Sequence, residues 1–135
     1  MTAEELLQQP ADAYMNAAQL AFFHDLLLGE RQALQARIAE EFESLKPHEI
    51  NSDPADIGSS EEARLWQLRV LEREKRLLDK IDEALERLAR GEYGWCAQTG
   101  EAIGLKRLLL RPTASLSVEA KEREEMRERH RQKVR

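Results

Sequence analysis

Residues 65–88 read LWQLRVLEREKRLLDKIDEALERL, and this stretch decides the fold. Its apolar side chains recur at steps of three, four or seven residues, which is the period of one face of an α-helix. The predicted stripe consists of Leu65, Leu68, Leu71, Leu78, Ile81, Leu85 and Leu88, and the charged run EREKR at 72–76 interrupts it. Gly91 then ends the helix in the manner of a C-cap.

A second amphipathic stretch precedes this one, at residues 17–45. Its stripe consists of Leu20, Phe23, Leu27, Leu34, Ile38 and Leu45, and at about 1.5 Å per residue the helix would be roughly 40 Å long. Pro47 ends it, because proline disfavours a helical conformation in the residue before it. The polar segment 46–60 separates the two helices. The second begins between 53 and 60, either with Asp53 before Pro54 or with a Ser59–Glu62 capping box.

Two long helices with a short polar turn predict a mainly α-helical fold, built as an antiparallel coiled-coil hairpin. Residues 1–16 form an N-terminal arm in which Thr2 and Glu5 have capping-box spacing, and residues 17–90 form the hairpin with its tip at 46–60. Residues 91–120 form a small globular base. Its glycines predict turns, and Trp95, Ile103, Leu105, Leu108 to Leu110 and Leu116 are available to pack it. Residues 121–135 belong to a charged C-terminal helix.

Composition favours a protein partner over a nucleic acid. The 135 residues include 35% charged and 5% aromatic residues and carry a net charge of −5, whereas sequence-independent DNA binding needs clustered Lys and Arg. The acidic N-terminus has no signal-peptide pattern, no apolar run is long enough to span a bilayer, and the single cysteine forms no intramolecular disulfide. We expect a cytoplasmic monomer. No catalytic constellation is present, so we expect no enzyme activity.

The stretch GEYGWCAQTGEAIGLKRLLLRPTASLSVEAK at 91–121 is similar to the zinc-finger segment of the DksA/TraR family. The family frame survives at Gly94, Gly100, Ile103, Arg107, the run RPTA at 111–114, and Lys121. DPAD at 53–56 resembles the family's D-x-x-D tip, and MNAAQLAFF at 15–23 resembles the start of its first helix. The resemblance covers residues 15–135 in order.

The zinc ligands of this family are the chief departure. The four ligand positions are Cys96, Thr99, Ser117 and Ala120. A structural zinc ion needs about four Cys or His ligands, so we expect no zinc and a base that folds by packing. Cys96 is interpreted as a relic ligand or small core residue, because no His or Asp beside it indicates an activated nucleophile.

The resemblance also implies functional residues. Asp53 and Asp56 would reach the active-site region of RNA polymerase through its secondary channel, and Gly58 stands where the family usually carries alanine. Arg73 would contact the channel rim. Guanosine tetraphosphate (ppGpp) would bind at the polymerase interface, against Leu77, Lys80, Arg111 and Lys121. The implied function is a stringent-response regulator that inhibits ribosomal RNA promoters and activates some amino-acid biosynthesis promoters.

Each of these residues also has a structural interpretation. Asp53 and Asp56 can cap the second helix, the basic residues can form a solvated face with Glu72–Arg76 pairing, and Arg111 can pair with Glu86. At the level of the whole chain, a coiled-coil adaptor without a role in transcription is the alternative. A transcript-cleavage factor of the Gre type shares the hairpin but lacks the RPTA segment. A further hypothesis is a backup regulator that stays folded when zinc is scarce or thiols are oxidised.

Overall fold

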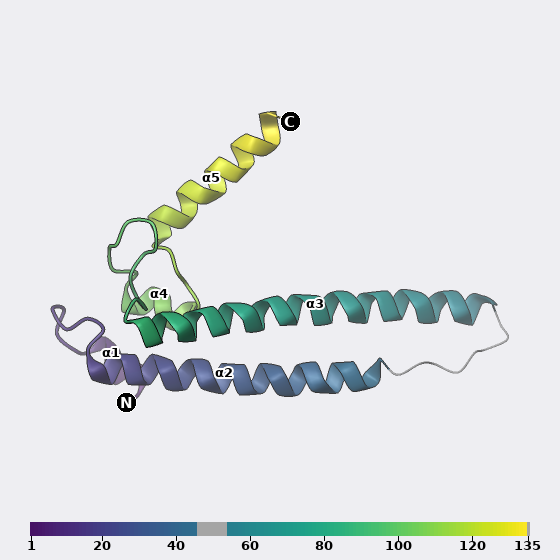
Figure 1. The fold of residues 1–135 in the computed structure, drawn as a ribbon, viewed down its shortest axis with the longest axis horizontal. Coiled ribbons are helices and arrows are strands. Elements are labelled where there is room, and N and C mark those ends of the chain that lie inside the picture. The colour runs from purple at the N-terminus through teal and green to yellow at the C-terminus, as the bar shows by residue number, and fades with distance from the viewer. Residues whose placement is uncertain (46–53, 135) are drawn as a thin grey trace. The chain divides into compact units, whose positions relative to one another are not determined.

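The structure is a computed structural model that describes residues 1–45 and 54–134, with the side chains of 54–57 and 134 excluded. The chain is mainly α-helical (Figure 1). Its helices are α1 (Ala3–Leu7), α2 (Ala17–Ser44), α3 (Pro54–Arg90), α4 (Leu105–Leu110) and α5 (Val118–Val134). The two long helices predicted from the apolar stripes are therefore confirmed. Pro54 occupies the first helical position of α3, as its fixed φ favours.

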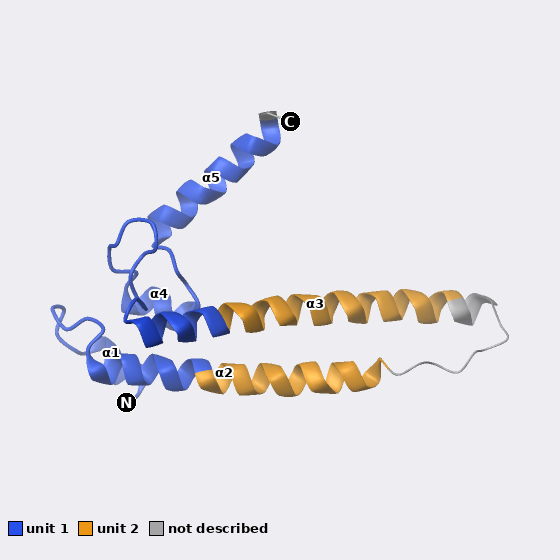
Figure 2. Cartoon of the chain, viewed as in Figure 1, with its two compact units in different colours: residues 1–27, 82–135 blue, residues 28–81 orange. Residues whose placement is uncertain are grey.

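The chain divides into two compact units, which Figure 2 colours separately. The hairpin unit comprises Leu28–Ile81, and the base unit comprises Met1–Leu27 together with Asp82–Arg135. Helices α2 and α3 each contribute to both units. The division into arm, hairpin, base module and C-terminal helix made from the sequence stays a prediction.

In the hairpin unit, segments of α2 and α3 run antiparallel. Leu34, Leu71 and Ile81 are buried, and the side chains of Glu41 on α2 and Glu74 on α3 lie close enough together that Glu74 raises the pKa of Glu41. This contact fixes the register and confirms the predicted hairpin. It also places a polar pair inside the charged interruption of the stripe, because Glu74 is only 8% exposed.

Leu65 and Leu68 are exposed, so the prediction that the buried stripe of α3 begins there is wrong. The reason is the unequal length of the helices, since α3 has 37 residues and α2 has 28. With Glu41 opposite Glu74, α2 has already ended at Ser44 before it would reach the level of Leu65 or Leu68. These two side chains therefore have no α2 residue to pack against.

The base unit has its own apolar core, which the aromatic contact between Phe23 of α2 and Tyr93 joins, with ring centroids 5.5 Å apart. Its buried apolar residues are Leu6, Phe23, Leu27, Ala84, Tyr93, Cys96, Ile103, Leu108 and Ala120. Leu105–Leu110 forms the short helix α4, where only turns were predicted. Trp95 and Leu110, which were expected to pack the base, are exposed.

Two capping boxes organise the N-terminal segment. Thr2 and Glu5 exchange backbone-to-side-chain hydrogen bonds, which confirms the predicted box at α1. Asn16 and Gln19 form a second box at the start of α2: the Gln19 N–H donates to Asn16 Oδ1 at 2.8 Å, and the Asn16 N–H donates to Gln19 Oε1 at 3.4 Å. Gln19 is fully buried, and its amide donates to Gln9 Oε1 and to the Ala13 carbonyl. Its polar side chain therefore fixes the arm against α2.

Within the described residues, no helix combines the length and apolarity that crossing a membrane requires.

Candidate functional site

The structure describes the predicted tip residues only in part. Asp53 lies outside the described residues, and Asp56 lies in the first turn of α3, where the backbone alone is described. Gly58 is exposed in the same helix, and a Cβ added there would meet no atom within 4 Å. Space therefore does not require glycine at this position. An alanine would fit and would favour the helix by roughly 0.5–1 kcal/mol.

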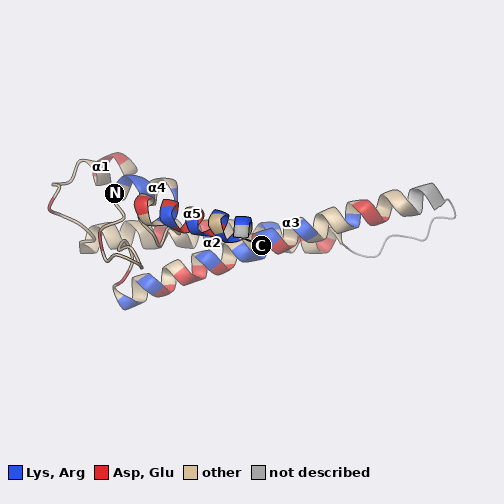
Figure 3. Cartoon of the chain, turned by 90° about the horizontal axis from the view of Figure 1, so that it is seen from above, with Lys and Arg blue, Asp and Glu red and all other residues tan. Residues whose placement is uncertain are grey.

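Arg73, Leu77 and Lys80 are exposed residues of α3 in the hairpin unit. Arg73 and Lys80 are seven residues apart, so they lie on one stripe of the helix. Basic residues are frequent along this part of α3 (Figure 3). Arg76 and Glu72 form the predicted pair at 4.0 Å. Because both side chains are exposed, the pair contributes little to stability.

The remaining two residues of the predicted ppGpp site belong to the base unit. Arg111 is exposed directly after α4, and Lys121 is half-buried in α5. Leu77 and Lys80 belong to the hairpin unit. The convergence of all four residues on one ligand therefore stays a prediction.

The segment after Arg111 is anchored by two side chains that the sequence reasoning missed. The Arg87 guanidinium donates to the Thr113 carbonyl at 3.1 Å, and the Tyr93 hydroxyl donates to the Pro112 carbonyl at 2.8 Å. These bonds attach the RPTA segment to the end of α3 and to the base core. The position of Arg111 is thus determined by its neighbours in the chain.

The four degenerate zinc-ligand positions form a hydrogen-bonded cluster. Cys96 is 3% exposed, and its sulfur accepts hydrogen bonds from the Thr99 hydroxyl and from backbone N–H groups of Gln98, Thr99 and Ser117. The Ser117 hydroxyl in turn accepts from the Ala120 N–H at 3.2 Å. Ser117 and Ala120 are both buried. The sulfur of Cys96 is therefore an acceptor for the backbone N–H groups that surround it.

These bonds change the acidity of the thiol. Burial by itself raises the pKa of Cys96, but the hydrogen bonds from Thr99, Ser117 and Gln98 together outweigh it and lower the pKa to about 6. The N–H and O–H donors stabilise the thiolate as a cation would. The sequence did not predict this, because three of the donors are backbone groups.

The backbone around Cys96 folds into a tight knuckle. The Cys96 N–H donates to the Glu101 carbonyl at 2.7 Å, the Ile103 N–H donates to the Gly94 carbonyl at 2.8 Å, and Trp95 pairs with Ala102 in an antiparallel bridge. Gly94 has a φ of +90°, and a Cβ there would come within 2.7 Å of the Met15 sulfur. The backbone conformation therefore favours glycine strongly, and any larger residue would also have to displace the Met15 side chain.

Tyr14 connects the N-terminal arm to this knuckle. Its hydroxyl donates to the Gly94 carbonyl at 2.5 Å and accepts from the Gly104 N–H at 2.9 Å. Burial raises the pKa of Tyr14 against the opposing effect of the Gly104 and Ile103 N–H groups, so the hydroxyl stays protonated and able to donate. The ring packs edge-on against Trp95, with centroids 5.0 Å apart. The sequence reasoning missed this contact, which joins residues 80 and 90 positions apart.

The donor set of the base does not fit a structural zinc ion. One thiol, two hydroxyls and a methyl group occupy the four ligand positions, and zinc sites of this kind use four Cys or His ligands. Among the residues that the structure describes, no group of three or more His, Cys, Asp or Glu side chains is placed to hold a metal.

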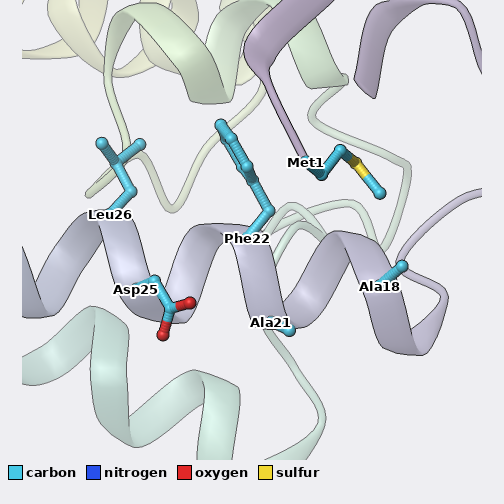
Figure 4. A pocket seen from close by; sticks show the side chains of 6 residues that line it. All are labelled: Met1, Ala18, Ala21, Phe22, Asp25 and Leu26. Atoms are coloured by element: carbon cyan, nitrogen blue, oxygen red, sulfur yellow. The ribbon is translucent and has the colours of Figure 1, made fainter. Parts of the chain in front are cut away.

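The base unit also contains an open pocket of about 520 Å³ beside the start of α2 (Figure 4). Its lining is apolar except for one carboxylate, and comprises Met1, Ala18, Ala21, Phe22, Asp25 and Leu26. A single carboxylate without a second convergent polar group gives little basis for selecting a ligand.

Comparison with known proteins places the chain in a family. Residues 19–88 match the family described as "DnaK suppressor protein DksA, N-terminal domain", and residues 91–125 match "Prokaryotic dksA/traR C4-type zinc finger". The RNA polymerase-binding transcription factor DksA of Caulobacter vibrioides is 46% identical over 119 residues, which cover 87% of this chain and 84% of that protein. Its counterpart in Escherichia coli K12 is 34% identical over 127 residues, with 93% and 84% covered.

A solved structure gives the same result. The transcription factor DksA2 from Pseudomonas aeruginosa is 68% identical and superposes with a TM-score of 0.86, covering 96% of this chain and 100% of that one. The family resemblance and the predicted fold class are thereby confirmed. The chain belongs to the DksA/TraR family, and it lacks that family's complete set of zinc-ligand cysteines.

Proposed function

We propose that this chain is a cytoplasmic, monomeric transcription regulator that binds bacterial RNA polymerase and has no enzyme activity of its own. The observation that carries the proposal is the 46% identity, over most of both chains, to a relative named an RNA polymerase-binding transcription factor. The tip of the hairpin enters the secondary channel of the polymerase. With ppGpp, the complex inhibits ribosomal RNA promoters and activates some amino-acid biosynthesis promoters.

In this proposal the tip acts by electrostatics. Asp53 and Asp56 bring carboxylates close to the polymerase active site, where they disturb local contacts without transferring protons. The helical backbone at Asp56 supports the proposal, because it makes Asp56 part of α3. Gly58 weakens this turn of the helix, so it lowers the potency of the regulator without changing its mode of action.

The basic residues have two roles. Arg73 contacts the acidic rim of the channel. Lys80 and Leu77 from α3, with Arg111 and Lys121 from the base unit, contact ppGpp at the polymerase interface. Arg and Lys from separate segments suit a ligand with several phosphates, and the exposure of Arg73, Leu77, Lys80 and Arg111 supports their availability to a partner.

Transcription in vitro tests the proposal. Purified RNA polymerase, a ribosomal RNA promoter and this protein are combined with and without ppGpp, beside Asp56→Asn and a charge-matched control, Asp79→Asn, at an exposed position of α3. We expect inhibition that deepens with ppGpp, is lost in Asp56→Asn and persists in Asp79→Asn. Lys80→Ala should lose only the ppGpp-dependent part, compared with Lys75→Ala. Absence of polymerase binding would refute the proposal and favour the coiled-coil adaptor.

We further propose that this function is independent of zinc, which would make the protein a backup regulator when zinc is scarce or thiols are oxidised. The hydrogen-bonded Cys96 cluster supports this, because it provides local contacts in the segment that matches a C4-type zinc-finger family. Circular dichroism with and without a strong chelator is the test. Loss of helical signal upon chelation would contradict zinc independence.

A further inference from the structure

Helix α3 carries a strongly exposed tryptophan in the hairpin unit. Trp66 is 65% exposed, and Leu65 beside it is 53% exposed. Single exposed apolar residues are common in proteins and need no explanation. Tryptophan is a special case, because burying it in an interface contributes more than burying most other side chains.

The position of Trp66 on the helix connects it with the basic residues of α3. Trp66, Arg73 and Lys80 follow one another at seven-residue steps, so each lies only about 20° around the helix from the last. Leu77 lies within about 20° of Trp66 on the other side of this line. We call this surface the α3 outer face; it consists of the exposed residues Trp66, Arg69, Arg73, Arg76, Leu77 and Lys80.

The charge of this face is opposite to that of the chain. Four of its six residues are Arg or Lys, whereas the whole chain has a net charge of −5. The neighbouring acidic residues Glu72 and Asp79 lie about 120–140° away from Trp66 around the helix, whereas Glu62, one turn toward the tip, lies about 40° from it. The face thus combines the apolar side chains of Trp66 and Leu77 with four basic side chains. Its complement is a recess that is apolar at its centre and acidic at its border.

We propose that Trp66 anchors the α3 outer face in such a recess on RNA polymerase, so that α3 binds along its length and not only at its tip. This inference rests on the proposed function, since Arg73, Leu77 and Lys80 are the contacts that function already assigns. Trp66 continues the same stripe two turns toward the tip. Tryptophan and arginine are the residues most enriched at the energetic centres of protein interfaces.

Binding kinetics with immobilised RNA polymerase holoenzyme provide the test. The variants are Trp66→Ala, the conservative Trp66→Phe, Arg69→Ala, and Leu110→Ala as a control for losing an exposed apolar side chain of the base unit. We expect Trp66→Ala to dissociate about 10- to 30-fold faster and Trp66→Phe to dissociate less than about 3-fold faster, since an aromatic ring is retained. Arg69→Ala should chiefly slow association and reduce its salt dependence. Leu110→Ala should bind like the wild type.

A loss of folding would not explain these effects, because an exposed Trp66 contributes little to stability; equal thermal melting of the wild type and Trp66→Ala checks this. If the wild type binds polymerase and Trp66→Ala binds equally well, the inference that Trp66 anchors α3 is wrong, and the proposed function stands. If the wild type does not bind polymerase, both proposals fail. Sedimentation that reveals a dimer, abolished by Trp66→Ala, would instead make the outer face an interface between two copies and would overturn the inference.

Discussion

The hydroxyl of Tyr14 provides the sharpest test of how the base stays folded. Replacing Tyr14 with phenylalanine keeps the ring on Trp95 and removes both hydrogen bonds, to the Gly94 carbonyl and from the Gly104 N–H. Each such bond contributes a net ~1 kcal/mol. We therefore expect the free energy of unfolding of the base unit to fall by about 2 kcal/mol.

Tyr93 supplies a matched control, because it is the only other tyrosine and its hydroxyl donates to the Pro112 carbonyl. Tyr93→Phe should lose about 1 kcal/mol, with any further contact of Tyr93 adding to this. Urea denaturation measures both variants. In a Trp66→Phe background Trp95 is the sole tryptophan, and since Tyr14 packs edge-on against it, its fluorescence reports on the base unit. A loss below about 0.5 kcal/mol for Tyr14→Phe would refute the reasoning.

Three other predictions follow from the geometry. Gly94→Ala should destabilise the base by about 1–3 kcal/mol in urea denaturation, because alanine is strained at a φ of +90° and its Cβ meets a side chain. The hydrogen bond and charge of Glu74, together with burial, raise the pKa of Glu41. The stability of the folded state is therefore greatest when Glu41 is protonated and falls as the pH rises through the raised pKa, so Glu41→Gln should stabilise at pH 7 and have little effect near pH 4. Thiolate absorbance of Cys96 should titrate near pH 6, and Thr99→Val should move the midpoint upward by removing a donor.

Each of these has a result that would contradict it. An unchanged stability for Gly94→Ala would mean that the knuckle relaxes without cost. An exposed neighbour, Glu40→Gln, controls for the loss of one negative charge; equal stabilisation by both variants would leave no special role for the Glu41 contact. The pKa of Cys96 is lower in the folded state, so its ionisation stabilises the folded protein at high pH. This contribution to the free energy of unfolding disappears as the pH falls through about 6. A midpoint above pH 8 would show that the hydrogen bonds do not outweigh burial.

Much of the fold could be predicted from local patterns. The helical period predicts α2 and α3 because apolar side chains at steps of three and four must be covered by another element. Where the prediction failed, the cause was not local. The exposure of Leu65 depends on where the other helix ends, and the surroundings of Trp95 depend on Tyr14, which approaches from the distant N-terminal arm and still leaves Trp95 40% exposed.

The site was harder to predict. The positions of the lost zinc ligands could be identified from the family frame, but the hydrogen bonds to Cys96 come largely from backbone N–H groups, which carry no side-chain signal. The anchors of the RPTA segment, Arg87 and Tyr93, resemble ordinary helix-end and core residues in the sequence. Long-range hydrogen bonds to carbonyl groups depend on tertiary structure and leave no periodic pattern.

The central claim is that a polymerase-binding regulator of this family works without zinc. The most direct measurement is inhibition of a ribosomal RNA promoter by protein that has been unfolded and refolded in a strong chelator, with its zinc content determined by mass spectrometry of the metal. The account predicts full, ppGpp-enhanced inhibition at negligible zinc content. Inhibition that is lost after chelation and returns upon adding zinc would contradict it.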